Sequence, residues 1–242
     1  CESLAYIGPG PAKAAYTIPT RTATFARQLV KIDMLTLEAT VFAPIVCPVG
    51  RKITGMCSAY DSVTGEWYLL AASSEDITSD PDRVETRVLL RIDPLTGVST
   101  IVASQAQLGD GRRFEGLGID SNGDLWATAR QWFYRIHQEA GYWVDEIGPT
   151  GLDKAEAFEV AFGYSGPSIS VPGVDPSWTT TGVFFVVDEQ GQKFGVINPA
   201  TGEFKEWQIS GTTSTFITQD AEGLILVTLS RDPLYGSLIT FD

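Results

Sequence analysis

The sequence predicts an all-β fold, a single β-propeller of four-stranded antiparallel blades, and three observations lead to this prediction. Apolar runs separated by turns recur with a period of about 44 residues. Asp-Pro, Asn-Pro and Thr-Gly pairs, which favour hairpin turns, stand between the runs. No helical pattern of comparable length interrupts them. A β-sandwich or two-sheet barrel is the alternative, but it explains the regular period less well.

The period is clearest from one apolar residue in each unit, which lies near the turn after the third strand. These residues are 60, 44, 61 and 44 positions apart: Ile32, Ile92, Ile136, Ile197 and Phe241. Four strands fit a unit of about 44 residues, and the longer intervals indicate insertions of about 16, since 60 − 44 = 16. We expect one domain over 1–242, with units at about 1–48, 49–107, 108–151, 152–210 and 211–242.

Five blades are expected. Their first strands lie near Leu4, Cys57, Leu117, Val160 and Ile217. The fifth unit reaches Asp242 before a fourth strand, which leaves two possibilities. Either residues 3–7 pair with the last blade and close a five-bladed ring, which we favour, or the chain continues past Asp242 into six or more blades.

The repeated turns resemble those of propeller groups that include gluconolactonase-like, strictosidine-synthase-like and YVTN-type repeat proteins. Glu115-Gly116 opens a blade and resembles the metal-binding Glu of gluconolactonase-like enzymes. The resemblance implies a propeller fold, one divalent cation such as Ca²⁺, and a metal-dependent hydrolase or lactonase activity. That family also takes ligands from asparagine, whereas Asn122 and Asn198, the only asparagines here, are expected in turns away from the site.

In a propeller, the loops after second strands and before first strands gather around the central channel, and this end is the default binding site of the fold. The candidate ligand or partner-binding residues at this end are Arg21, Glu75, Arg130, Trp132, Arg231 and Asp232. The candidate metal ligands are Glu115, Glu159 and Asp188. Ion pairs lining a wet channel are the structural alternative. Arg130 either neutralises the carboxylates or binds an acidic ligand, and the net charge favours the first.

Seventeen basic and thirty acidic side chains give a net charge of 17 − 30 = −13. This charge argues against a nucleic-acid partner, because phosphate contacts need a basic surface. No apolar run reaches the roughly 18 residues of a membrane span.

The acidic charge and a possible Cys47–Cys57 disulfide favour an extracytoplasmic location, although Cys57 is equally well explained as a buried apolar residue. Cys1 resembles the lipid-modified first residue of a bacterial lipoprotein, and a cut chain would begin in the same way.

Other motifs favour structural explanations. His137 is the only histidine, so a triad or multi-histidine site would have to use it, and we expect a solvated strand residue. The segment 120–124 resembles the start of a calcium loop, but Asn122-Gly123 favours a turn. A group of aromatic residues offers either a sugar-stacking platform or, as we favour, packing between blades: Trp126, Trp132, Phe133, Tyr142 and Trp143.

Three functions follow from these observations. The favoured one is a non-catalytic, extracytoplasmic propeller that binds a protein partner through the insertions at 74–86 and 164–182. The first alternative is the metal-dependent hydrolase or lactonase, and the second is a carbohydrate-binding propeller.

Overall fold

The computed structural model describes residues 4–8, 14–18, 28–33, 35–36, 38–45, 51–75, 85–161, 173–188, 193–206, 213–219, 225–232 and 235–241. Within these ranges the helices are α1 (Gln105–Leu108) and two 3₁₀ helices, η1 (Glu139–Gly141) and η2 (Pro176–Thr179). In the described part of the chain, no helix has the length and apolar character that a membrane span needs.

The strands form antiparallel sheets in chain order. The first sheet contains β1 (Leu4–Ile7), β2 (Ala14–Thr17), β3 (Gln28–Ile32) and β4 (Ala39–Pro44). The second contains β5 (Arg51–Asp61), β6 (Glu66–Glu75), β8 (Val88–Ile92) and β9 (Ser99–Ala103). The third contains β11 (Gly116–Ile119), β12 (Leu125–Ala129), β13 (Trp132–His137) and β14 (Trp143–Pro149). The fourth contains β15 (Ala155–Ala161), β16 (Val183–Asp188), β17 (Lys193–Ile197) and β18 (Phe204–Glu206).

The fifth sheet contains three strands among the described residues, and a small ribbon lies between the second and third sheets. The fifth sheet is β19 (Thr213–Gln219), β20 (Ile225–Asp232) and β21 (Tyr235–Phe241). The ribbon pairs β7 (Glu85–Thr86) with β10 (Asp110–Gly111).

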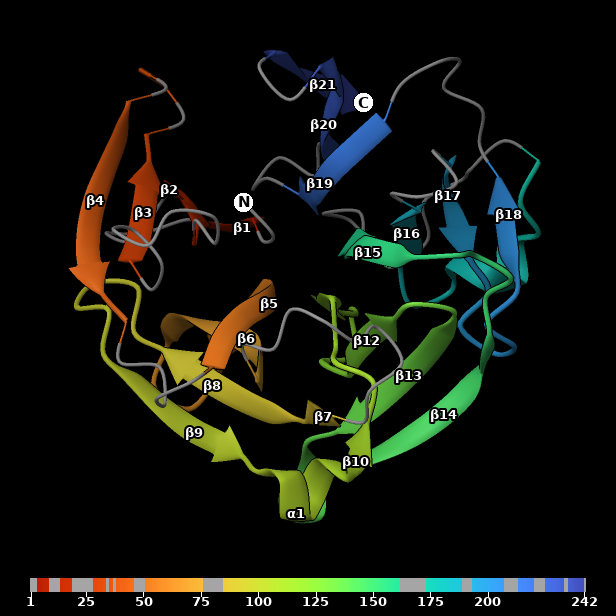
Figure 1. Ribbon diagram of the computed structural model, residues 1–242, viewed down its shortest axis with the longest axis horizontal. Helices are drawn as coiled ribbons and strands as arrows, with labels where there is room; N and C mark the ends of the chain where they lie inside the picture. The colour runs from red at the N-terminus through yellow and green to blue at the C-terminus, as the bar shows by residue number, and fades with distance from the viewer. Residues whose placement is uncertain are drawn as a thin grey trace.

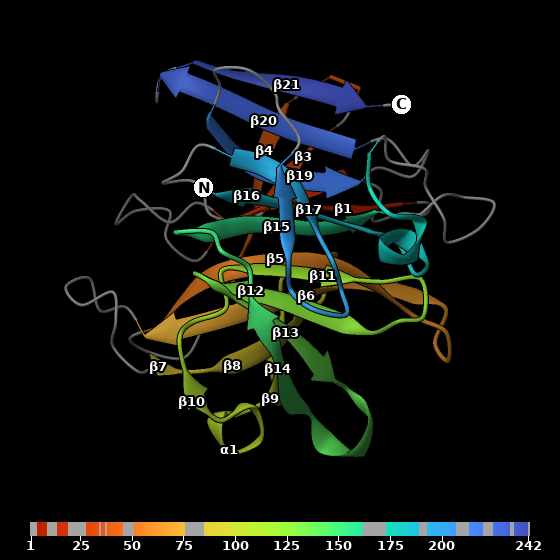
Figure 2. The same ribbon diagram turned by 90° about the vertical axis from the view of Figure 1, so that its right-hand side faces the viewer.

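The five sheets are arranged around a common centre, as Figure 1 shows. The first strand of each sheet contacts the first strand of the next: β1 with β5, β5 with β11, β11 with β15, and β15 with β19. The last inner strand, β19, contacts β1 and completes the circle. In Figure 2, turned by 90°, β5, β11 and β15 run across the picture along the axis of the ring. The predicted all-β propeller of four-stranded antiparallel sheets is confirmed.

The expected closure by residues 3–7 is wrong. Strand β1 pairs with β2, Leu4 opposite Thr17, and so forms the innermost strand of the first sheet rather than an outer strand of the last. The two strands are apolar and largely buried. Because the link between them is short, pairing with the next segment in the chain is the simplest connection.

Two glycines let β11 approach β15 closely. A Cβ atom at Gly116 would lie 2.5 Å from Cβ of Phe158, and one at Gly118 would lie 2.9 Å from Cγ2 of Val160. Contacts this short do not occur between real side chains, so only glycine fits at these positions. The glycine of the Glu115-Gly116 pair is therefore explained by packing between inner strands.

The core is divided into clusters between neighbouring sheets. Between the third and fourth sheets, Trp126 stacks on Phe133 with ring centroids 5.2 Å apart, and Phe184 meets both rings edge-on. Trp132 and Tyr142 pack partly buried against the cluster between the second and third sheets. Four of the five aromatic residues considered for a sugar platform thus pack in the core, which supports the packing interpretation.

Five members of the repeated hydrophobic-Asp or hydrophobic-Asn element lie within the described ranges and form one kind of turn. In each case the side-chain oxygen accepts a hydrogen bond of 2.7–3.0 Å from the backbone amide two residues later, at Asp33, Asp61, Asp93, Asp120 and Asn198. These Asx turns explain why Asp and Asn recur with the period of the repeat. At Asp120 they also support the turn interpretation of 120–124 over the calcium loop.

Candidate ligand site at the mouth of the ring

Second strands end and first strands begin at one end of the ring, which we call the mouth. In the third and fourth sheets the mouth comprises residues 111–116, 129–132, 150–155 and Asp188. Glu115 directly precedes β11, Arg130 follows β12, and Asp188 ends β16. The opposite end of the third sheet, which we call the lower end, comprises the turns 119–125 and 137–143.

Glu115 is a buried carboxylate, 4% exposed. Its Oε1 accepts from Nε of Arg113 at 2.8 Å and forms an ion pair with Nη2 of Arg113, also at 2.8 Å. Its Oε2 accepts from the backbone amide of Arg130 at 3.3 Å. The neutralising cation is therefore Arg113, and the expectation that the Arg130 side chain has this role is wrong. The sequence contains a signal for this ion pair. Arg113 and Glu115 are two residues apart, and in an extended segment such residues point to the same side.

Arg130 has a left-handed backbone conformation, with φ = 54°. Its amide donates to Glu115, and its carbonyl accepts from the amide of Ala155 at 2.9 Å. These two bonds hold the turn between the entry to β11 and the start of β15. The Arg130 guanidinium is half-buried, and within the described residues no hydrogen bond or ion pair is found for it. A left-handed arginine costs about 1–2 kcal/mol, and such strain concentrates at functional sites.

Asp188 is fully buried and is held by the backbone. It lies opposite Ala155 in the register of β15 and β16. Its carboxylate accepts from the amides of Asp153 at 3.2 Å and Lys154 at 3.0 Å. These bonds anchor the loop that leads into β15, so Asp188 has a clear structural function at the mouth.

Arg87 positions the segment that carries Arg113. The Arg87 side chain is 5% exposed, and its guanidinium lies over the rings of Phe114 and Tyr134, 4.3 and 4.8 Å from their centroids. Its Nε donates to the carbonyl of Arg112 at 2.8 Å. Burial raises the pKa of Tyr134, so its hydroxyl stays protonated and the ring stays neutral beside the cation. Sequence reasoning missed Arg87, which comes from a different sheet and has no local motif.

The described residues do not fit a divalent cation. Such a site needs several converging oxygen or nitrogen ligands, and no group of three His, Cys, Asp or Glu side chains among those described has this arrangement. Oε1 of Glu115 already accepts from a guanidinium. Because the Glu159 side chain lies outside the described part, the predicted set of Glu115, Glu159 and Asp188 stays a prediction.

Several other predicted residues lie at least partly outside the described structure. Arg21, Cys1 and Cys47 are outside the described residues, so the disulfide and the lipid anchor stay predictions, while Cys57 is buried in the core. The backbones of Glu75, Arg231 and Asp232 are described, near the mouth ends of β6 and β20, but their side chains are not. The Trp132 side chain is half-buried at the start of β13.

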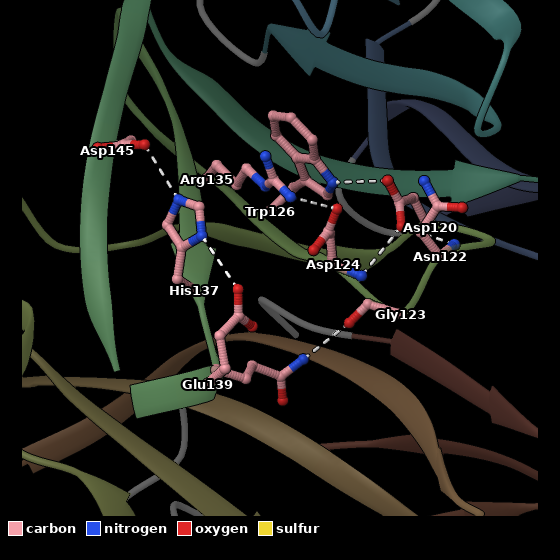
Figure 3. A network of polar contacts seen from close by, with 10 residues as sticks. Asp120, Asn122, Gly123, Asp124, Trp126, Arg135, His137, Glu139 and Asp145 are labelled. Atoms are coloured by element: carbon pink, nitrogen blue, oxygen red, sulfur yellow. Dashed lines mark hydrogen bonds and ion pairs between the residues drawn. The ribbon is translucent and has the colours of Figure 1, made fainter. Parts of the chain in front are cut away.

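Figure 3 shows the polar network at the lower end of the third sheet. Asp124 forms an ion pair with Arg135 at 2.6 Å, and Oδ2 of Asp120 accepts from the indole of Trp126 at 3.2 Å. His137 lies 3.0 Å from Asp145 and stacks on Trp143 with centroids 3.6 Å apart. It is 8% exposed, so the expectation of a solvated histidine is wrong. The stack depends on the pairing of β13 with β14, which places Trp143 opposite His137.

No protein-family model and no curated protein matches the sequence. Several solved structures share the fold, each at low identity. The calcium-binding protein regucalcin from Agrobacterium tumefaciens is 10% identical, with a TM-score of 0.55, over 96% of this chain and 68% of that one. A luciferin-regenerating enzyme is 10% identical, with a TM-score of 0.55, over 98% of this chain and 74% of that one. A gluconolactonase from Xanthomonas campestris is 11% identical, with a TM-score of 0.50, over 88% of this chain and 64% of that one.

Proposed function

We propose that the protein is a hydrolase of small lactones or esters, and that the reaction takes place at the mouth beside Glu115. The observation that carries the proposal is a buried, ion-paired carboxylate at the entry to an inner strand of a propeller. The fold shared with a gluconolactonase and a luciferin-regenerating enzyme supports a small-molecule substrate over a protein partner.

The geometry suits a role for Glu115 in orienting water. Arg113 forms an ion pair with Oε1, and among the described residues the one donor to Oε2 is the Arg130 amide, at 3.3 Å. A lone pair on Oε2 is therefore available to a water molecule. In the reaction the water oxygen adds to the carbonyl carbon, the ring C–O bond breaks, and a proton from water ends on the released alcohol oxygen. The product is a hydroxy acid, which gives its acidic proton to solvent.

The test is hydrolysis of glucono-1,4-lactone followed by acid release, with EDTA and, separately, with added Ca²⁺, Mg²⁺, Mn²⁺ or Zn²⁺. We expect a rate above that of buffer, and a loss of about 100-fold or more in Glu115→Gln. The matched control is Glu139→Gln, which changes an exposed carboxylate at the lower end and should leave the rate unchanged. If wild type gives no acceleration under any condition, the hydrolase proposal is wrong and the protein-binding scaffold becomes the better proposal.

A further inference from the structure

We infer that the ligand of the mouth carries a carboxylate group, and that the guanidinium of Arg130 binds it. The inference rests on the proposed function for its substrate class, because it specifies acidic lactones or esters. It rests on separate observations for the binding group itself, which are the backbone of Arg130, its unsatisfied donors and the local charge.

The backbone around Arg130 is held rigidly in an unfavourable conformation. Its amide is bound to Glu115 and its carbonyl to Ala155, so a left-handed φ of 54° is imposed from both sides. Glycine adopts this conformation without strain, as it does at Gly123, where φ is 85°. A structural turn alone would be served better by glycine. The presence of a long cationic side chain at a strained position points to a use for that side chain.

The donors of Arg130 are available to a ligand. A guanidinium has five N–H donors, and within the described structure no carboxylate or carbonyl accepts from those of Arg130. Two neighbouring arginines already have partners within the protein. Arg113 forms an ion pair with Glu115, and the guanidinium of Arg87 lies over the rings of Phe114 and Tyr134. A second polar atom close by also lacks a partner, the buried Oγ1 of Thr128, two residues before Arg130.

The local charge at the mouth is opposite in sign to that of the whole chain. Among the residues that define the mouth, four basic side chains, Arg112, Arg113, Arg130 and Lys154, stand against three acidic ones, Glu115, Asp153 and Asp188. The two buried carboxylates, Glu115 and Asp188, already accept hydrogen bonds from a guanidinium and from backbone amides. These donors offset the repulsion that the two carboxylates exert on an anion near Arg130. The planar fork of a guanidinium matches a carboxylate in a bidentate arrangement.

Two lactones that differ in one group provide the test. Glucaro-1,4-lactone carries a carboxylate where glucono-1,4-lactone carries a hydroxymethyl group. We expect wild type to hydrolyse the acidic lactone with at least a tenfold higher kcat/KM. Arg130→Gln should lower kcat/KM for the acidic lactone about 10- to 100-fold more than it lowers kcat/KM for the neutral lactone. Arg130→Lys should retain part of the preference, because it keeps the charge but loses the fork.

The matched control is Arg91→Gln, which removes the same charge in the second sheet, where Arg91 pairs with Asp61 away from the mouth. It should leave both rates unchanged. Calorimetric titration of glucarate and of glucitol, the neutral polyol that lacks both carboxylates, separates this inference from the proposed function. Binding of glucarate that depends on Arg130, without hydrolysis of either lactone, would support the inference and contradict the hydrolase. Equal binding of glucarate and glucitol, equal effects of the two arginine variants, or no binding of glucarate would overturn the inference.

Discussion

The two ends of the third sheet are built from the same residue types but use them differently. At the lower end, Asp120 accepts from the amides of Asn122 and Asp124 and from the indole of Trp126, and the left-handed residue of this turn is Gly123 (Figure 3). The second turn of the lower end has a left-handed Tyr142, with φ = 63°, whose side chain packs against the core. At the mouth, the left-handed position is Arg130, and its guanidinium has no acceptor within the described structure. Both ends therefore contain one strained residue that is not glycine, but the Tyr142 side chain is used in packing. At the mouth, strain coincides with side-chain donors that have no acceptor among the described residues, which is the pattern expected of a binding site.

The first prediction concerns the ion pair that anchors the mouth, and it has the largest expected effect. Arg113→Ala should lower the free energy of unfolding by about 3 kcal/mol, because it leaves the Glu115 charge buried without its cation. Glu115→Gln in the same chain should restore part of this loss, since it removes that charge. Urea unfolding of the two single variants and the double variant measures the coupling. Purely additive losses would show that the pair does not stabilise the mouth.

A second prediction concerns substitutions at two left-handed positions, Arg130 at the mouth and Gly123 at the lower end. Arg130→Gly should raise the free energy of unfolding by about 0.5–1 kcal/mol, because it removes the strain at φ = 54°. Gly123→Ala should lower it by about 1 kcal/mol, because φ is 85° there although the space around Gly123 is open. Thermal unfolding of both variants beside wild type measures these shifts. If Arg130→Gly proves less stable than wild type, the arginine has a structural partner and the functional interpretation of the strain loses its basis.

The smallest predicted effect is a difference in sign between two Asx turns as pH changes. Backbone hydrogen bonds from Thr64 and Val63 lower the pKa of Asp61, so its contribution to stability is present above the ordinary carboxyl pKa and is lost as pH falls through the lowered value. Burial raises the pKa of Asp120, so its contribution falls as pH rises through the ordinary carboxyl range to the raised value.

Asp61→Asn and Asp120→Asn, compared with wild type in melts from pH 2.5 to 7, separate the two cases. The advantage of wild type over Asp61→Asn should grow as pH rises. The advantage over Asp120→Asn should shrink over the same interval. Parallel curves for the two variants would contradict the assignment of burial as the dominant cause at Asp120.

The parts of this molecule that follow from local rules were predictable from the sequence. Asp and Asn that recur with the period of the repeat form Asx turns, and Glu115 lies at the mouth as expected from its place before an inner strand. The partners that join distant segments were not predictable. Arg87 reaches Phe114 and Tyr134 from another sheet, and His137 is buried by Trp143 only through the register of β13 and β14. The strand near Leu4 is the first strand of its sheet as expected, but the predicted closure of the ring by residues 3–7 is wrong, because a single segment does not encode its pairing partner.

The central claim is that the mouth, and not the lower end, binds the ligand. Hydrogen–deuterium exchange with and without saturating glucarate tests it directly, because amides are followed at both ends of the same sheet in one experiment. We expect slower exchange of amides in 111–116 and 128–132 when glucarate is bound, with unchanged exchange in 119–124 and 137–145. Slower exchange confined to the lower-end segments, or no change at the mouth, would contradict it.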